Sequence, residues 1–283
     1  MHCQNKNSRH SIKSNMTYIL YHADCPDGFT AAYATWKHFG AKATYLPVQH
    51  NQPIPELKPN ASVYLVDFCY PKDILLKIVE NAENVQVLDH HVSAQKDLAD
   101  INLTAYPTLK ILFDMHKSGA VLAWEHFHVG KPLPDFFSYV QDKDLWQFKL
   151  PLSKEFSAAL RCHEMRFDVW DKLIPKTQEL CTEGIILMRY QTQLVNKLCN
   201  NMFLTEVGGY QVPTVNSGVL QSEIGNLLCM QNPESKFSIV YFQAEGKSMY
   251  SLRSIGDFDV SLIAKQFGGG GHKNAAGFVK LQN

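Results

Sequence analysis

The sequence predicts an α/β protein in which a parallel sheet with helices on both faces is joined by a helical linker to a smaller α+β domain. Between residues 17 and 89, short aliphatic strands alternate with helical patterns, and this alternation requires crossover connections and therefore parallel strands. Residues 177–199 form the longest helical pattern of the chain. From residue 203 the pattern changes to short strands with two helices among them, which indicates a second unit.

Composition and charge narrow the class of protein. The chain has 283 residues, enough for two domains, and 45% of them are hydrophobic, which is ample for a core. Lys plus Arg and Asp plus Glu number 27 each. A neutral chain lacks the broad basic face that holds long duplex nucleic acid, so we expect a small or short substrate, although a local basic patch is compatible with these numbers.

Cysteine usage and the absence of long apolar runs bear on the compartment. The seven cysteines are scattered without a CxxC pair, which favours reduced thiols over disulfides or a zinc site. Residues 1–15 are positively charged without an apolar core, so we predict a flexible tail rather than a secretory signal. No apolar run reaches the roughly 18 residues of a membrane span. We therefore expect a cytoplasmic protein with no membrane contact.

The predicted N-terminal domain comprises residues 16–172, and turn-forming residues separate its elements. Gly40 closes the first helix, Pro71 opens the second, and three prolines within 51–60 predict a loop. Residues 151–175 carry mixed signals and receive no assignment. Strands are predicted at 17–21, 43–48, 62–67 and 85–88, and helices at 29–39, 71–83, 118–127 and 134–140.

A connecting helix over 173–200 is followed by the predicted smaller domain over 201–283. Its strands are expected at 203–207, 210–215, 237–243 and 248–253, and its helices at 221–230 and 260–267.

Polar side chains gather where the predicted N-terminal strands end. Asp89, His90 and His91 directly follow a buried strand, and a helix cap with two surface histidines would explain this motif alone. Other strand-like runs in this half also end in acidic residues, and the carboxyl ends of parallel strands meet at one edge. That repetition indicates a site. Its candidates are His22, Asp24, Asp27, Asp67, Asp89, His90, His91 and, after a helix, Asp142.

The residue types at this edge favour divalent metal ions. Clustered carboxylates repel one another unless cations neutralise them. Mixed carboxylate and imidazole ligands suit manganese, magnesium, iron or cobalt. Two such ions about 3.5–4 Å apart are a standard device for hydrolysing phosphoesters.

Six motifs, in order, carry a resemblance to a known family. They are HADCPDG at 22–28, VDF at 66–68, LDHH at 88–91, QDKD at 141–144, SLRS at 251–254 and GGGGHKNAAGF at 268–278. With these the chain resembles the DHH superfamily of phosphoesterases, including their DHH-associated C-terminal domain, and within it the nanoRNase or oligoribonuclease type. The resemblance covers nearly all of residues 17–280.

The resemblance implies two divalent ions, most often manganese, with magnesium or cobalt as alternatives. Asp67 would bridge the ions, a water between them would be the nucleophile, His91 would lie beside the scissile phosphate, and Asp89 would orient the histidines. Two residues separate Asp24 from Asp27, where many members have one, so which of them serves which ion stays open. The implied ligands are His22, Asp24, Asp27, Asp67, His90 and Asp142.

The second domain contributes the predicted substrate-binding residues. A dinucleotide-binding loop is excluded because the glycine run follows a helix rather than a strand. Four glycines let backbone amides approach an anion, and the Arg253 guanidinium matches a phosphate. Ser118 is interpreted as a helix cap, with substrate contact as the alternative, and whether Arg161 and His163 face the cleft stays open. The predicted substrate-binding residues are Arg253, Gly269, Gly270, Gly271 and His272.

Together with the neutral charge, the resemblance implies a metal-dependent phosphodiesterase that hydrolyses short oligoribonucleotides or linear dinucleotides to mononucleotides. The first alternative is an inorganic pyrophosphatase or exopolyphosphatase of the same superfamily, whose members usually carry a more basic C-terminal signature. The second is a non-catalytic nucleotide-binding protein that keeps the fold. A homodimer is compatible with the sequence.

Overall fold

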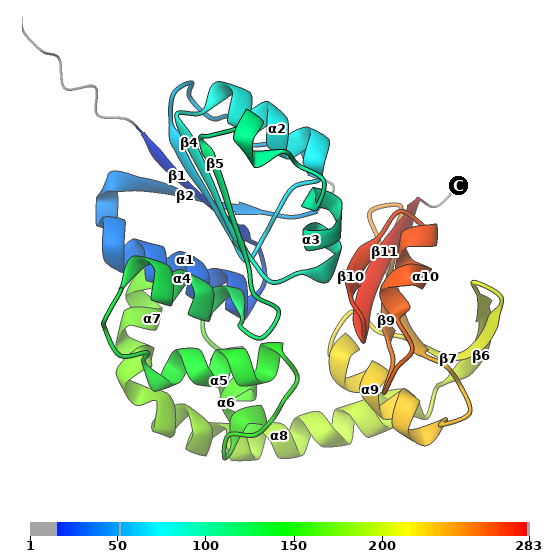
Figure 1. Ribbon diagram of the computed structural model, residues 1–283. Helices are drawn as coiled ribbons and strands as arrows, with labels where there is room; N and C mark the ends of the chain where they lie inside the picture. Colours follow the sequence, from blue (N-terminus) through cyan, green and yellow to red (C-terminus); the bar gives the residue numbers. More distant parts are fainter. Residues whose placement is uncertain (1–15, 51, 282–283) are drawn as a thin grey trace, which may run out of the picture.

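Five parallel strands form the N-terminal sheet in the order β2-β1-β3-β4-β5. The computed structural model describes residues 16–50 and 52–281, so the tail predicted over 1–15 lies outside the described residues. Because all five strands run the same way, their carboxyl ends share one edge of the sheet (Figure 1). The strands are β1 Thr17–His22, β2 Ala43–Val48, β3 Ser62–Val66, β4 Asn84–Asp89 and β5 Leu109–Phe113.

Helices cover both faces of this sheet, because alternate strand residues point to opposite sides. Ile19 packs on one face with α1 and α4, while Leu20 packs on the other with α2. The predicted α/β class with helices on both faces is thus confirmed. The helices of this half are α1 Pro26–Phe39, α2 Lys72–Asn81, α3 Val92–Leu98, α4 Gly119–Phe127, α5 Asp135–Asp144, α6 Ser153–Leu160 and α7 Phe167–Leu173.

Helix α8, Thr177–Cys199, connects the two halves and packs against each of them (Figure 1). Its first half lies against α6 so closely that a Cβ added at Gly184 would come 1.9 Å from the Glu155 carbonyl oxygen. Its last turns bury Val195 and Cys199 among residues of the second half. A helix anchored in both cores holds the two halves in a defined relation.

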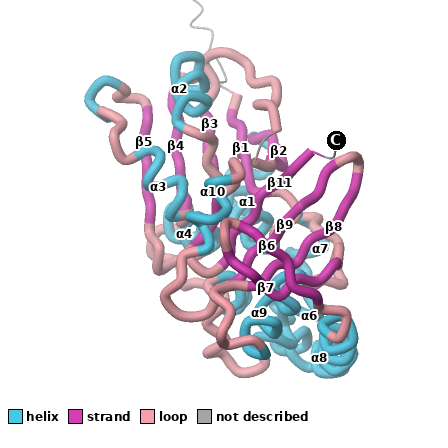
Figure 2. The backbone as a smooth tube through the Cα atoms, turned by 90° about the vertical axis from the view of Figure 1, so that its right-hand side faces the viewer, coloured by secondary structure: helices cyan, strands magenta, loops and turns pink. Residues whose placement is uncertain are grey.

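A six-stranded sheet in the order β10-β11-β9-β8-β7-β6 forms the C-terminal half (Figure 2). Its pairs are antiparallel except β7 with β8, so the sheet of the predicted smaller α+β domain is mixed. Helix α9 packs on one face with the end of α8, and α10 packs on the other. The elements are β6 Phe203–Val207, β7 Tyr210–Asn216, α9 Gln221–Gln231, β8 Ser238–Ala244, β9 Lys247–Arg253, α10 Val260–Gln266, β10 Gly270–His272 and β11 Ala275–Leu281.

Several elements had no predicted counterpart, namely α3, α6, α7, β5, β10 and β11. Each is short, five to eight residues except β10 with three, so that the hydrophobic period repeats too few times to be recognised. Helix α5 runs to Asp144, four residues past its predicted end at 140, which places the whole QDKD motif in its last turns. Within the described part of the chain, no helix is both long and apolar enough to cross a membrane.

Candidate metal and substrate site

The centre of the candidate site is Asp67, directly after β3. Its backbone adopts a left-handed conformation, φ 54°, which turns its buried side chain across the strand ends. One carboxylate oxygen, Oδ1, lies 3.1 Å from His90 Nε2, and the other, Oδ2, lies 3.7 Å from His22 Nδ1. The two oxygens therefore face different imidazoles, contributed by β1 and by the turn after β4.

Asp27 joins this cluster from the first turn of α1. Its carboxylate accepts hydrogen bonds from the backbone N–H groups of Gly119 (2.7 Å) and Ala120 (3.0 Å) at the start of α4. The same carboxylate lies 3.7 Å from His90 Nε2. This close approach needs a glycine, because a Cβ at Gly119 would lie 2.3 Å from the Asp67 Cβ.

Asp144, rather than Asp142, completes the cluster. Asp144 Oδ2 lies 3.5 Å from His90 Nε2. The Asp142 carboxylate is turned away and accepts hydrogen bonds from the backbone N–H groups of Lys149 (2.9 Å) and Leu150 (3.2 Å). Asp142 was predicted as a metal ligand, but two positions along a helix correspond to about 200° of rotation, which points the two carboxylates in different directions.

The different surroundings of these two aspartates give opposite expected effects. Asp144→Asn should lower the affinity for divalent metal and leave thermal stability in chelator nearly unchanged. Asp142→Asn should retain metal binding but cost about 1–3 kcal/mol of stability, because it weakens two charge-assisted hydrogen bonds. Metal titration calorimetry and thermal unfolding in chelator measure both quantities. If Asp142→Asn lost metal affinity and Asp144→Asn did not, the metal ligand would be Asp142, as predicted from the sequence.

Beside the cluster, the buried Asp89 pairs with the partly buried His91. Asp89 Oδ1 lies 2.7 Å from His91 Nδ1 and also accepts the backbone N–H groups of His90 (2.7 Å) and His91 (3.3 Å). These contacts fix the ring of His91 and leave its Nε2 atom facing away from Asp89. Burial acts to lower the pKa of His91, but the Asp89 carboxylate outweighs it and raises that pKa.

Of the first-motif residues, His22 faces the cluster and Asp24 does not. Asp24 has a left-handed backbone, φ 55°, and its carboxylate accepts a hydrogen bond from Gln49 Nε2 at 2.8 Å. The structure therefore places Asp27 in the cluster and Asp24 on its rim. The intervening Cys25 lies near His22 and Asp67, but burial, followed by the neighbouring carboxylates, raises the pKa of its thiol well above the usual value.

The electrostatics of the cluster favour a cation. Burial, together with the neighbouring carboxylates, raises the pKa of Asp27 well above its usual value. Burial acts to raise the pKa of Asp67 as well, but the neighbouring imidazoles of His22 and His90 hold it below the usual value. Burial opposes protonation of His90, yet Asp67 and Asp144 raise its pKa to about 10. Three carboxylates thus draw positive charge to their centre.

The donor set fits hard or borderline divalent ions. Among the described residues, Asp67 Oδ2 and Asp144 Oδ2 are buried without a hydrogen-bond partner, so each has a lone pair available to a cation. Four groups of side chains offer ligand atoms within 4.8 Å of one another: His22, Cys25 and Asp67; Asp67, Asp89, His90 and His91; Asp27, His90 and Asp144; and His90, His91 and His272.

The second domain reaches the cluster through His272. The His272 ring stacks on His91 with centroids 4.6 Å apart and lies 5.2 Å from His90. Burial and the charges of His91 and His90 lower the pKa of His272 to about 3. A Cβ added at Gly270 would lie 3.7 Å from the Ser93 side chain on α3, so strand β10 contacts the N-terminal half directly (Figure 1).

The three glycines predicted to bind substrate lie in two different settings. The Gly269 amide donates to the Ala264 carbonyl at 2.9 Å, and a Cβ there would lie 2.0 Å from the Gly277 oxygen. Gly269, predicted to bind substrate, therefore closes α10 instead, because its amide is already used. Gly270 and Gly271 belong to β10 beside His272, and Gly271 has φ 135°.

Arg253, at the end of β9, is partly committed to its own domain. Its Nη2 donates to Ser222 Oγ (2.7 Å) and its Nη1 to the Leu252 carbonyl (2.8 Å). Burial lowers the pKa of Arg253, and Glu223 acts in the opposite direction. Its remaining N–H groups stay available to an anion.

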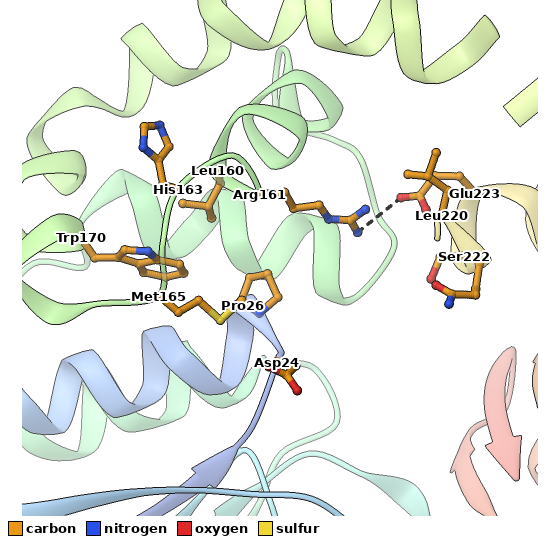
Figure 3. Close-up of a pocket in the computed structure, with 11 residues that line it drawn as sticks. Asp24, Pro26, Leu160, Arg161, His163, Met165, Trp170, Leu220, Ser222 and Glu223 are labelled. Atoms are coloured by element: carbon orange, nitrogen blue, oxygen red, sulfur yellow. Dashed lines mark ion pairs between the residues drawn. The ribbon is translucent and has the colours of Figure 1, made fainter. Parts of the chain in front are cut away.

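A cavity of about 300 Å³ lies between the first motif and helix α9, and it is lined by residues that the sequence left open or did not identify (Figure 3). Arg161 and His163 line it, and Arg161 points across the domain boundary to Glu223 of α9. Asp24 and Pro26 of the first motif line the same cavity. Glu223 carried no sequence signal, because its partners lie 62 and 80 residues away.

Similarity to known proteins agrees with this arrangement. Residues 207–280 match the DHHA1 domain family. The chain is 32% identical to protein R106 of Acanthamoeba polyphaga mimivirus, which is uncharacterized, over 94% of this chain and 68% of that protein.

Two solved structures cover most of the chain at low identity. They are the pGpG-specific phosphodiesterase PggH from Vibrio cholerae (14% identity, 94% of each chain, TM-score 0.49) and RecJ in complex with Mn²⁺ from Thermus thermophilus (14% identity, 95% of this chain and 50% of that chain, TM-score 0.48).

With its motifs and its family match, the chain belongs to the DHH superfamily and carries a C-terminal DHHA1 domain.

Proposed function

We propose that the protein is a metal-dependent phosphodiesterase that cleaves short oligoribonucleotides or linear dinucleotides to mononucleotides. One observation carries the proposal: the carboxylate–imidazole cluster of the first domain faces His272 of the DHHA1 domain at 4.6–5.2 Å between ring centroids. A substrate phosphate beside these rings would meet both the proposed metal ligands and the DHHA1 residues.

Two divalent ions would be held by His22, Asp27, Asp67, His90 and Asp144. Asp67 is the candidate bridging ligand, since its two oxygens face two different imidazoles. Such ions, when bound, polarise a phosphoryl oxygen and lower the pKa of water. Asp24, proposed from the sequence as a ligand, would act at the rim.

The chain's own residues would position the phosphate and manage its charge. His91, held by Asp89 through Nδ1, presents Nε2 as a donor to a phosphoryl oxygen. His272 is neutral at physiological pH because its pKa is near 3, so it can also accept a hydrogen bond from the substrate. Arg253, Gly270 and Gly271 would bind the part of the substrate that does not react.

The size of the cavity favours a short substrate. A volume of about 300 Å³ lies at the lower end of the range of roughly 300–1,000 Å³ for small-molecule sites. The 27 basic and 27 acidic residues leave no net charge for a long nucleic acid backbone. Both features fit one or two nucleotides better than a polymer.

A substrate panel tests the proposal. Purified protein with manganese is incubated with oligoribonucleotides of two to about twenty residues, the linear dinucleotide pApA, pyrophosphate and polyphosphate, and products are separated by chromatography. We expect mononucleotides to form fastest from the shortest oligomers. Faster release of inorganic phosphate from pyrophosphate or polyphosphate would favour the alternative family activity, and no turnover of any member would favour the non-catalytic alternative.

Metal reconstitution gives a separate expected result. Activity removed by a chelator should return best with manganese, less with magnesium, and poorly with calcium. The physical reason is that compact carboxylate–imidazole sites suit ions with short bonds, whereas calcium prefers six to eight oxygen ligands. Initial rates across a metal titration measure the order. Full recovery with calcium alone would contradict this donor assignment.

A further inference from the structure

Three cationic side chains converge on one carboxylate at the domain boundary. Lys143 of α5 and Arg161 after α6 approach Glu223 Oε1 at 2.9 Å and 3.5 Å. Arg253 lies near the same carboxylate from strand β9. Three cations and one carboxylate give this group a net charge of plus two. The group is largely shielded from solvent, since the Lys143 and Glu223 side chains are 16% and 18% exposed.

The pairing of these charges is incomplete. Both close contacts use the same oxygen, Oε1, while Oε2 is buried and has no hydrogen-bond partner among the described residues. A stable buried ion pair would satisfy both oxygens, since an unsatisfied buried oxygen costs free energy. A phosphate, with three terminal oxygens, would satisfy this cationic group better than one carboxylate oxygen does.

The cationic group is also placed within reach of a bound nucleotide. Arg161 and Glu223 line the same cavity as Asp24 and Pro26 of the first motif (Figure 3). Lys143 lines a second cavity, which Arg161 and Glu223 share. In Figure 3 the Arg161–Glu223 pair spans the cavity between the two domains. A phosphate at the pair would lie in the cavity that the first motif also lines.

We propose that Lys143 and Arg161 form a second phosphate subsite, and that Glu223 is an exchangeable counter-ion which the non-reacting phosphate of a nucleotide displaces. The inference rests on the proposed nucleotide substrate and specifies one of its features, recognition of a phosphate that is not cleaved. A simple inter-domain latch is the competing explanation. The two explanations predict different signs for the change in phosphate affinity. If the pair is a latch, removing either partner should change the affinity in the same direction. If Glu223 is a displaced counter-ion, removing it should strengthen phosphate binding, whereas removing Arg161 should weaken it.

Binding without metal tests the subsite. Isothermal titration calorimetry of the full chain in chelator compares adenosine 5′-monophosphate with adenosine, so that the ratio of the two Kd values reports the phosphate alone. Wild-type protein should bind the monophosphate about ten- to a hundredfold more tightly, the range of a charge-assisted contact. Arg161→Gln should reduce this ratio by at least about fivefold, and Glu223→Gln should raise it about threefold or more.

Matched controls come from exposed ion pairs elsewhere. Arg166→Gln removes an arginine paired with Asp168, and Glu179→Gln removes a glutamate paired with Lys176, so both should leave the ratio unchanged. Lys143→Gln repeats the Arg161 test from another helix if Arg161→Gln unfolds. Changes of the same sign in Arg161→Gln and Glu223→Gln would establish the latch and overturn the subsite, as would equal affinities of wild type for the two ligands.

The outcome also separates this inference from the proposed function. If the protein hydrolyses short oligonucleotides but shows no phosphate-dependent binding at Arg161, the subsite proposal is refuted and the proposed enzyme function still stands. If Arg161→Gln and Glu223→Gln change the Kd ratio in opposite directions but the protein cleaves no member of the panel, the hydrolase proposal is refuted and the phosphate subsite still stands.

Discussion

Asp67→Asn should lower kcat/KM for a dinucleotide by more than about a thousandfold, equivalent to roughly 4 kcal/mol of transition-state stabilisation. Asp67 is the residue whose two oxygens face both His22 and His90, so its charge supports both imidazole ligands. Asparagine keeps the shape and tolerates the left-handed backbone at φ 54°, which alanine would strain. The loss therefore reports the carboxylate charge rather than a collapsed turn.

Stability measurements separate lost chemistry from lost fold. In chelator, the Tm of Asp67→Asn should stay within about 4 °C of wild type, because the lost contact with His90 is offset by less repulsion with Asp27 and Asp144. Manganese should raise the Tm of wild type and much less that of the variant. Asp100→Asn, which removes an exposed carboxylate paired with Lys72, is the matched control and should behave as wild type. Near-normal turnover by Asp67→Asn would refute the two-metal assignment.

The central part of the site could be predicted because parallel topology brings strand ends together. His22, Asp67 and Asp89 each lie at or directly after the end of a strand in the same sheet, so recognising three strands was enough to bring them to one edge. The aliphatic strands and the helices between them were recognisable for the same reason, since both faces of the sheet need apolar cover.

The choice between Asp142 and Asp144 could not be made from the sequence. Both lie in the last turn of α5, and the predicted end at 140 left the direction of each side chain undefined. Tertiary contacts decide it, because the loop amides at Lys149 and Leu150 take up Asp142. The same limit applies to Gly269. The sequence predicts the helix before it, but not the hydrogen bond from the Gly269 amide to the Ala264 carbonyl that ends this helix.

The cationic group at the domain boundary was beyond sequence patterns for a different reason. Lys143, Arg161 and Glu223 belong to separate helical regions in two domains, and each alone is an ordinary charged surface residue. Only the packing of α6 and α9 against the shared helix α8 brings them together. Long-range placement of this kind depends on how the two halves dock, which no local periodicity encodes.

Gly119→Ala should remove activity by at least about a hundredfold and also destabilise the protein by about 1–3 kcal/mol, the usual cost of overpacking. An added Cβ would lie 2.3 Å from the Asp67 Cβ and 2.8 Å from its Cα, and neither backbone can yield easily. Helix α4 would have to withdraw, which would break the two hydrogen bonds that its first amides donate to Asp27. One methyl group would thus displace two proposed metal ligands.

The sign of the stability change makes this substitution diagnostic. In a helix free of such contacts, alanine is favoured over glycine by about 1 kcal/mol, so a stabilised variant would show that α4 does not press on Asp67. Gly218→Ala is the matched control, because its Cβ would meet nothing nearer than 3.8 Å. Thermal unfolding, metal titration and dinucleotide kinetics on the two variants complete the comparison. We expect Gly218→Ala to match wild type in all three and Gly119→Ala to lose metal affinity together with turnover, since the interval between α4 and β3 sets the positions of Asp27 and Asp67 alike.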